Sequence, residues 1–221
     1  MKKGKKQRFL YRNGLSVVMF SLFALFIFGH LLSGWQVKNE ELSQNNLPAI
    51  GLLQYIQNPH FIQSTFENWE SEFLQMCLYI ILTVSLRQKG SSESKKLEGE
   101  EEVDREPVPH FKAPWPVKKG GIWLTLYQHS LSIAFALLFV LSFFIHFNAS
   151  IAKFNEEQSE KRLPEQSWSE YLLNANFWFE SFQNWQSEFL AVGALVLLTI
   201  WLREKGSPQS KPVDATHDEE S

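Results

Sequence analysis

The sequence predicts an all-α membrane protein with four transmembrane helices. Three observations support this fold class: apolar residues gather in four long runs, charged residues gather between the runs, and the second half of the chain repeats the first. The averages hide this pattern, because a mean hydropathy of -0.19 and 20% charged residues are typical of a soluble protein. Four core helices of a soluble domain are the alternative, but they need polar stripes that the first and third runs lack.

The first and third runs have the length and composition of membrane spans. Leu15 to Leu32 and Leu131 to Phe147 contain no Lys, Arg, Asp or Glu. At a rise of about 1.5 Å per residue, roughly 17 to 20 such residues cross the hydrocarbon core of a bilayer. We place these spans at about residues 14–34 and 129–149.

The second and fourth runs, Phe73 to Leu86 and Phe189 to Leu202, are shorter. They become long enough to span when the helices start earlier, at about residues 66–87 and 182–203. Each run ends in Leu-Arg-x-Lys-Gly, and cations in the last turn followed by glycine are typical of a helix end.

The basic residues predict the orientation in the membrane. Seventeen of the 21 Lys and Arg residues lie before the first span, between the second and third, or after the fourth. Since basic residues favour the cytoplasmic side, we expect both termini there and two acidic loops outside. A cleaved signal peptide would also begin with a basic segment and an apolar run. The recurrence of that run in the middle of the chain argues against cleavage.

An internal repeat divides the chain. A shift of 116 residues lays 11–95 on 127–211 without a gap, and 33 of the 85 positions are identical, far above chance. Each repeat holds two spans, so both insert in the same direction. We expect two tandem two-helix repeats with pseudo-two-fold symmetry along the membrane normal. Outside them lie a basic cytoplasmic tail (1–13), an acidic and Pro-rich cytoplasmic linker (96–121) and a disordered cytoplasmic tail (212–221).

Polar residues that recur in both repeats are candidates for a site inside the membrane. An ionisable group in a bilayer is costly and is usually found facing the interior of a helix bundle. Matched depths predict a His30–Glu72 pair, repeated as His146–Glu188, since each group lies about one turn below the outer interface. Asn68 and Asn184 precede the glutamates by one turn and complete the set Glu72, Glu188, His30, His146, Asn68 and Asn184. Structural pairing, or glutamates that reach up to the interface, is the alternative to an ion or proton site.

Aromatic residues are frequent in the two outer loops. Trp69 and Trp185 recur at the start of the returning helices, where amphipathic rings favour the headgroup level. We therefore interpret them as interfacial anchors, with a ligand-binding aromatic pocket as the alternative.

Several functional classes find no support in the sequence. The single Cys77 excludes a disulfide framework and a Cys-based zinc site, and a net charge of -3 gives no basic footprint for nucleic acid. Two His and two Glu are able to bind zinc, but no closely spaced ligand motif supports a metal, so we expect neither metal nor other cofactor. Nucleophile motifs, a P-loop and a dinucleotide fingerprint are lacking, which leaves enzyme activity unsupported.

The block Asn184-Trp-Gln-Ser-Glu-Phe-Leu190, followed by Leu202-Arg-Glu-Lys-Gly-Ser-Pro208, resembles an uncharacterised family of bacterial integral membrane proteins, known as a domain of unknown function. The resemblance covers nearly the whole chain and implies a bacterial inner-membrane protein, but it supplies no activity, substrate or catalytic residues. The first repeat departs from the block at Glu70 and Ser92.

The sequence favours a non-enzymatic structural or accessory component of the inner membrane. Its partners are then the lipid bilayer and either further copies of this chain or another membrane protein. The alternative is a small oligomeric ion or proton channel or transporter that uses Glu72 and Glu188 with His30 and His146.

Overall fold

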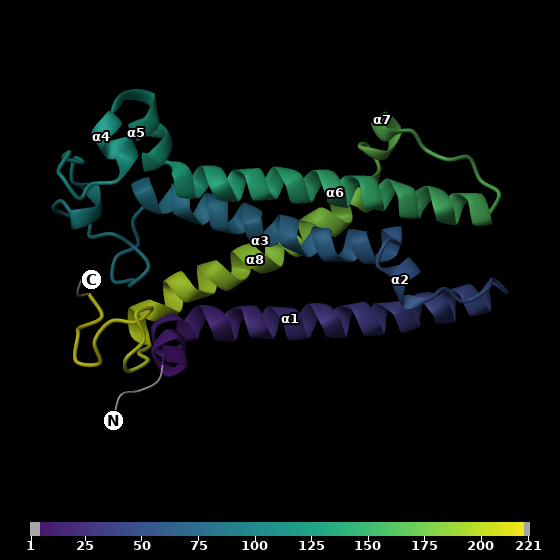
Figure 1. The fold of residues 1–221 in the computed structure, drawn as a ribbon, viewed down its shortest axis with the longest axis horizontal. Coiled ribbons are helices and arrows are strands. Elements are labelled where there is room, and N and C mark those ends of the chain that lie inside the picture. The colour runs from purple at the N-terminus through teal and green to yellow at the C-terminus, as the bar shows by residue number, and fades with distance from the viewer. Residues whose placement is uncertain (1–4, 219–221) are drawn as a thin grey trace.

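The computed structural model describes residues 5–218, with side chains from Phe9 onward, and this part of the chain is helical without a strand. Its four long helices are α1 (Lys5–Gln44), α3 (Pro59–Ser85), α6 (Ser130–Glu160) and α8 (Ala175–Trp201). Figure 1 shows them as an elongated bundle, with both chain ends at one end of it. The prediction of an all-α fold is confirmed for the described residues.

Short helices lie at the two ends of the bundle. α2 (Leu52–Tyr55) and α7 (Trp168–Tyr171) lie at the end away from the termini, in the loops that precede α3 and α8 (Figure 1). The 3-10 helix η1 (Glu102–Asp104), α4 (Trp115–Lys119) and α5 (Gly121–Gln128) belong to the segment between α3 and α6.

Two of the long helices have the length and apolar composition needed to cross a membrane, Phe9–Gln44 of α1 and Ser130–Glu160 of α6. Their apolar side chains remain exposed, for example Phe20 at 73% and Leu137 at 65%. α1 is kinked at Asn13, whose backbone angles are not helical and whose Nδ2 donates to the Phe9 carbonyl at 3.0 Å. This kink separates the basic start of the chain from the apolar part of α1.

α3 and α8 begin and end in the same way. Asn58 and Asn174 cap them, each side chain accepting a hydrogen bond from the backbone N–H two residues on, at 2.9 Å. Such caps satisfy backbone donors that the first helical turn leaves free. At the other end, Leu86 and Leu202 turn into extended backbone. Both helices therefore start about two turns before the spans predicted from the sequence.

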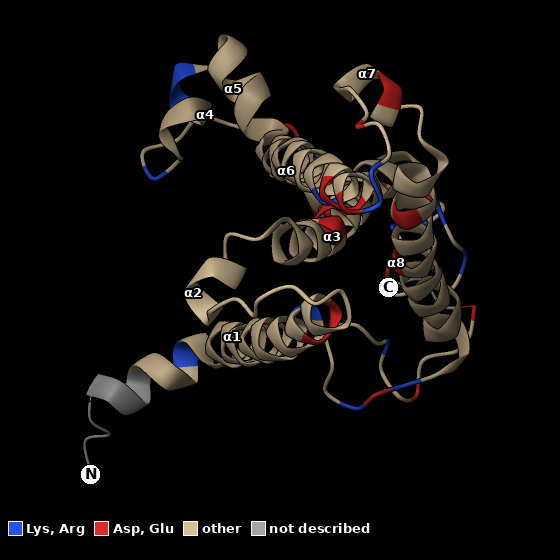
Figure 2. Cartoon of the chain, turned by 90° about the vertical axis from the view of Figure 1, so that its right-hand side faces the viewer, with Lys and Arg blue, Asp and Glu red and all other residues tan. Residues whose placement is uncertain are grey.

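α3 is the central helix of the bundle. It packs most extensively on α6, while α8 crosses it and α1 makes only a few contacts with it. The end-on view of Figure 2 shows α3 between α1 and α6, with α8 to one side. The closest pairing is therefore between α3 of the first half and α6 of the second.

A mainly aromatic cluster lies at the end of the bundle that contains α7 (Figure 1). Phe147, Ile151, Tyr171 and Phe177 are buried together, with Phe143, Phe154 and Trp178 packed around them. The rings of Phe147 and Phe177 meet edge to face with centroids 5.1 Å apart. Such pairs stabilise by about 0.5–1.5 kcal/mol beyond the area they bury. This cluster holds α7 and the start of α8 against α6.

The same local contacts occur at equivalent positions of the two halves. Asn39 makes two hydrogen bonds to the backbone of Ile50, and Asn155 makes the same two to Gln166. Arg87 donates from Nε to the carbonyl of Lys96, and Arg203 to that of Pro212, both at 3.2 Å.

The segments predicted as linker and tail make specific contacts. Lys119 lies between the rings of Trp115 and Trp123, 4.8 and 4.7 Å from their centroids. After α8, Arg203 also bonds the carbonyls of Ala215 and Thr216. Residues 212–218 thus lie against the end of α8, and the last part of the predicted disordered tail, 219–221, lies outside the described residues.

Candidate functional site

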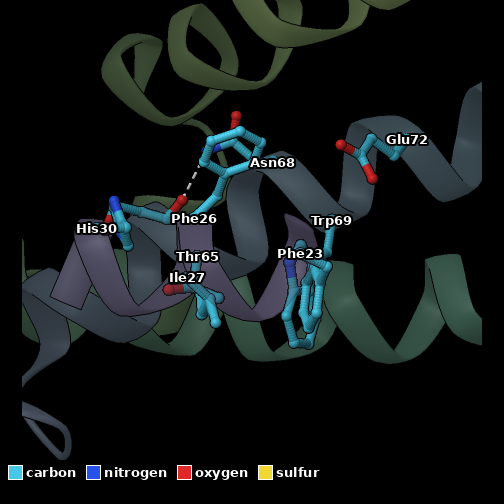
Figure 3. Close-up of a pocket in the computed structure, with 9 residues that line it drawn as sticks. Phe23, Phe26, Ile27, His30, Thr65, Asn68, Trp69 and Glu72 are labelled. Carbon is cyan, nitrogen blue, oxygen red and sulfur yellow. Dashed lines mark hydrogen bonds between the residues drawn. The ribbon is translucent and has the colours of Figure 1, made fainter. Parts of the chain in front are cut away.

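A groove separates α1 from α3 and contains three of the polar residues singled out by the sequence. It has a volume of about 290 Å³, and His30, Asn68 and Glu72 line it together with Trp69 and several apolar side chains. In Figure 3, His30 and Glu72 lie at opposite ends of the groove. The side of α3 that faces α1 is packed less closely than the side that faces α6.

His30 bonds to Ser64 and not to Glu72. Nε2 of His30 lies 3.0 Å from Oγ of Ser64, and Nδ2 of Asn68 donates to the Ser64 carbonyl at 2.7 Å. The register of the two antiparallel helices explains the difference from the expected pair. Ser64 lies opposite His30, and Glu72 is eight residues further along α3, a distance of about 12 Å.

His146 also has a different partner from the one expected within its own half. Its Nδ1 donates to Oε2 of Glu70 at 2.7 Å, and both side chains are fully buried. The second oxygen of Glu70 accepts from Nε1 of Trp185 at 3.0 Å. Glu70 on α3 thus joins α6 and α8. The reason is the packing of α6 on α3, which brings the histidine of the second half to a carboxylate of the first.

Further carboxylates surround this pair. Glu67 accepts a hydrogen bond from Asn184, and Glu180 accepts one from Nε2 of Gln63 at 2.7 Å. Glu67, His146 and Glu180 each offer a ligand atom, and the three atoms lie within 4.8 Å of one another. We call Glu67, Glu70, His146 and Glu180, with their partners Gln63, Asn184 and Trp185, the polar centre.

One nitrogen of the polar centre has no partner in the described part of the chain. Nε2 of His146 is buried without a hydrogen bond, while the ring lies 5.2 Å from that of Phe177. A buried donor or acceptor without a partner costs about 1–3 kcal/mol. Among the described residues that could hold a metal ion, Glu67, His146 and Glu180 are the ones gathered closely enough.

The remaining predicted residues lie outside the polar centre. Glu72 and Asn68 are exposed and Glu188 is half-buried. Trp69 packs on Phe23 across the groove, with ring centroids 5.9 Å apart, whereas Trp185 donates to Glu70. Of the six predicted site residues, His146 and Asn184 belong to the polar centre.

Three carboxylates of the polar centre are not among the site residues predicted from the sequence. Glu67, Glu70 and Glu180 do not recur in the other half, where the equivalent residues are Gln183, Gln186 and Ser64. Their presence beside apolar runs is the signal that could have found them, since carboxylates there need partners.

A second pair, between a buried tyrosine of α2 and a half-buried histidine at the start of α3, lies outside the predicted spans. The hydroxyl of Tyr55 and Nδ1 of His60 are 2.8 Å apart. Burial raises the pKa of Tyr55 to about 12. Burial, and after it the positive charges of Lys153 and Lys38, lower the pKa of His60. Burial and these charges therefore disfavour the protonated imidazole.

The fold and the site together define a chain that is helical over its described residues, with two helices long and apolar enough to cross a membrane and with polar groups gathered between its long helices. Residues 6–221 match the family model described as Domain of unknown function (DUF6766). The chain belongs to this family. Comparison with the curated proteins and with the solved structures finds no match.

Proposed function

We propose that this chain is a four-span protein of the bacterial inner membrane that acts as a non-enzymatic structural or accessory component. The observation that carries the proposal is the pattern of bonds in the polar centre. Glu70 joins three helices, and Glu67 and Glu180 each bond across to a neighbouring helix. These hydrogen bonds hold the helices together, as a structural role requires.

The placement in a membrane draws support from the exposed apolar surface. Side chains such as those of Phe20 and Leu137 are exposed around α1 and α6, and a bilayer would cover them. α3 and α8 have 27 residues each, about 40 Å of helix, which is enough to cross the hydrocarbon core. Their more polar outer halves would lie against α6 or the groove and not against lipid.

The orientation draws support from the arrangement of the ends. Both termini and the segment with α4 and α5 lie at one end of the bundle (Figure 1). The sequence concentrates its basic residues in these parts, which favours the cytoplasmic side for that end. α2 and α7 would then lie outside.

The tandem repeat draws support from the equivalent hydrogen bonds of Asn39 and Asn155 and of Arg87 and Arg203. In addition, Asn46 and Arg162, which are equivalent after the shift, both have positive φ, 55° and 57°. Such backbone is uncommon for residues other than glycine. Its recurrence at one position of each half fits an origin by duplication.

The topology is tested by labelling single cysteines in a Cys77→Ser background with a membrane-impermeant maleimide. We expect labelling at Gly51→Cys and Ser167→Cys in intact spheroplasts, and at Glu100→Cys only after permeabilisation. The two outer positions are matched across the halves and control for each other. Labelling of Glu100→Cys in intact spheroplasts would contradict the orientation.

The structural role is tested by the variant Glu70→Gln in liposomes. We expect lower stability or altered assembly, with proton and cation flux unchanged and at background in both proteins. A flux in wild type that this variant abolishes while it remains folded would refute a purely structural role.

A small oligomeric ion or proton channel is the second candidate. The groove favours it, because His30, Asn68 and Glu72 line an open space of about 290 Å³ within the apolar part of the bundle. Glu188 and His146 are their equivalents in the other half. This candidate requires that the Glu72→Gln/Glu188→Gln double variant lose flux while keeping its fold, and that the protein form an oligomer, since four helices are few to line a pore.

A further inference from the structure

We propose that Glu67, His146 and Glu180 bind one divalent first-row transition-metal ion, such as Zn²⁺. The three residues come from α3, α6 and α8, and their ligand atoms lie within 4.8 Å of one another. A metal held at about 2.0–2.2 Å by nitrogen and carboxylate ligands brings those atoms to roughly 3–4 Å apart. Side-chain movements of about 1 Å therefore close the site. The inference depends on the polar centre and not on the proposed membrane role.

The unpartnered nitrogen of His146 is the independent observation that points to a ligand. The side chain is fully buried, and Nδ1 is already bonded to Glu70. Nε2 remains, without a partner among the described residues. A histidine that ligates a metal through one nitrogen typically donates from the other to a carboxylate, which fixes the tautomer and the ring orientation. His146 and Glu70 have this arrangement.

Each proposed ligand has an outer partner that orients it. Glu70 orients His146 and is itself bonded to Trp185, while Asn184 bonds Glu67 and Gln63 bonds Glu180. Outer hydrogen bonds of this kind hold the ligand atoms in position before the ion arrives. They leave the other oxygen of each glutamate free to bind the metal.

The charges in the site also favour a dication. Glu67 and Glu180 place two carboxyl groups in a partly buried position, where unpaired negative charge is costly. A divalent ion compensates them, and His146 binds as a neutral ligand. Lys153 and Glu157 line a neighbouring cavity of about 370 Å³ that reaches Glu180 and Gln63. This cavity therefore borders one of the three proposed ligands, Glu180.

The donor set selects the class of metal. One imidazole and two carboxylates suit zinc, iron, manganese, cobalt or nickel, whereas Mg²⁺ and Ca²⁺ prefer oxygen ligands alone. The only cysteine, Cys77, bonds to the Ser132 carbonyl and takes no part. Three protein ligands leave at least one position for water.

The chain contains a matched control. His30 is equivalent to His146, but the residue opposite it is Ser64, where the second half has Glu180. The groove thus contains the equivalent histidine, half-buried and bonded to a serine in place of a carboxylate. We expect one metal per chain and none at His30.

The test uses the purified full-length protein, without a polyhistidine tag, stripped with chelator and titrated with Zn²⁺ or Co²⁺. We expect one ion per chain by elemental analysis, a visible Co²⁺ spectrum typical of a nitrogen and oxygen site, and no displacement by millimolar Mg²⁺. His146→Gln and the Glu67→Gln/Glu180→Gln pair should lose the ion. Glu70→Gln should weaken binding about 10- to 100-fold, and His30→Gln should change it less than about two-fold.

The proposal would be overturned by wild type that binds less than about 0.2 ions per chain, by His146→Gln that binds as wild type does, or by loss of the ion in His30→Gln. If His146→Gln does not fold, the Glu67→Gln/Glu180→Gln pair and the Co²⁺ spectrum of wild type test the proposal instead. A spectrum without histidine coordination, or full displacement by Mg²⁺, would equally contradict it.

Discussion

Replacement of Glu70 by alanine tests how much the polar centre stabilises the bundle. The change removes the acceptor of two buried donors, Nδ1 of His146 and Nε1 of Trp185. Each buried donor that loses its acceptor costs about 1–3 kcal/mol. Because two donors lose theirs, we expect the free energy of unfolding to fall by about 2–6 kcal/mol.

The assay is reversible unfolding of the metal-free protein in mixed micelles, followed by far-UV circular dichroism across a denaturant series. Gln186→Ala is the matched control, because Gln186 is the equivalent of Glu70 and is exposed. It should change the stability by less than about 0.5 kcal/mol. Equal, small effects of the two substitutions would refute the reasoning, since they would mean that Glu70 does not join the three helices.

Three further predictions concern side chains toward the end of the bundle away from the chain termini. Each is checked by thermal or denaturant unfolding in detergent. Phe177→Ala should destabilise by about 3–5 kcal/mol because this ring is fully buried, whereas Phe179→Ala, at 68% exposed, should have little effect. Gly34→Ala should destabilise by about 1–3 kcal/mol, because the added Cβ would meet the hydroxyl of the buried Tyr55. Gly29→Ala is the control and should be neutral or slightly stabilising, because open space surrounds its Cβ. Burial lowers the pKa of His60 in the folded state. The stability that this neutral imidazole contributes is therefore complete above the unfolded pKa of about 6.5, and it is lost as the pH falls through the folded pKa. Wild type should therefore lose more stability than His60→Gln between pH 7 and 5, and parallel losses would contradict this.

The helical class and the two most apolar helices could be predicted from the sequence. Leu15 to Leu32 and Leu131 to Phe147 are uninterrupted apolar runs, which are far too long for a strand, and they lie inside α1 and α6. The starts of α3 and α8 were predicted less well. Their first two turns carry polar residues, so the hydropathy pattern does not mark them, and the caps Asn58 and Asn174 carry the signal instead.

The pairing of helices could not be predicted in the same way. The two-fold repeat suggested that each histidine meets the glutamate of its own half, but repeated sequence says nothing about which helices come into contact. α6 packs most extensively on α3, and this brings His146 to Glu70. Contacts between distant segments depend on side-chain volumes over whole helix faces, which no single motif records.

Recurrence in both halves does not identify the carboxylates of the polar centre. Identity between the halves selects residues that both halves need, and these include His30 and His146. The carboxylates around His146 occur once, so a search for repetition discards them. Likewise, ligands drawn from three helices show no close spacing in the sequence, which is why no metal motif was visible.

The polar centre therefore lies where the two halves differ. At three positions the equivalent residues are Glu67 and Gln183, Glu70 and Gln186, and Ser64 and Glu180. The first two place carboxylates on α3 and the third places one on α8, so all three surround His146, while His30 bonds to a serine. These differences between the halves gather carboxylates on one side of α3, where their hydrogen bonds connect α3, α6 and α8. The side toward α1 remains an open groove with few contacts. The tight side is thus suited to hold an ion, whereas α1 is the long helix that makes the fewest contacts with α3.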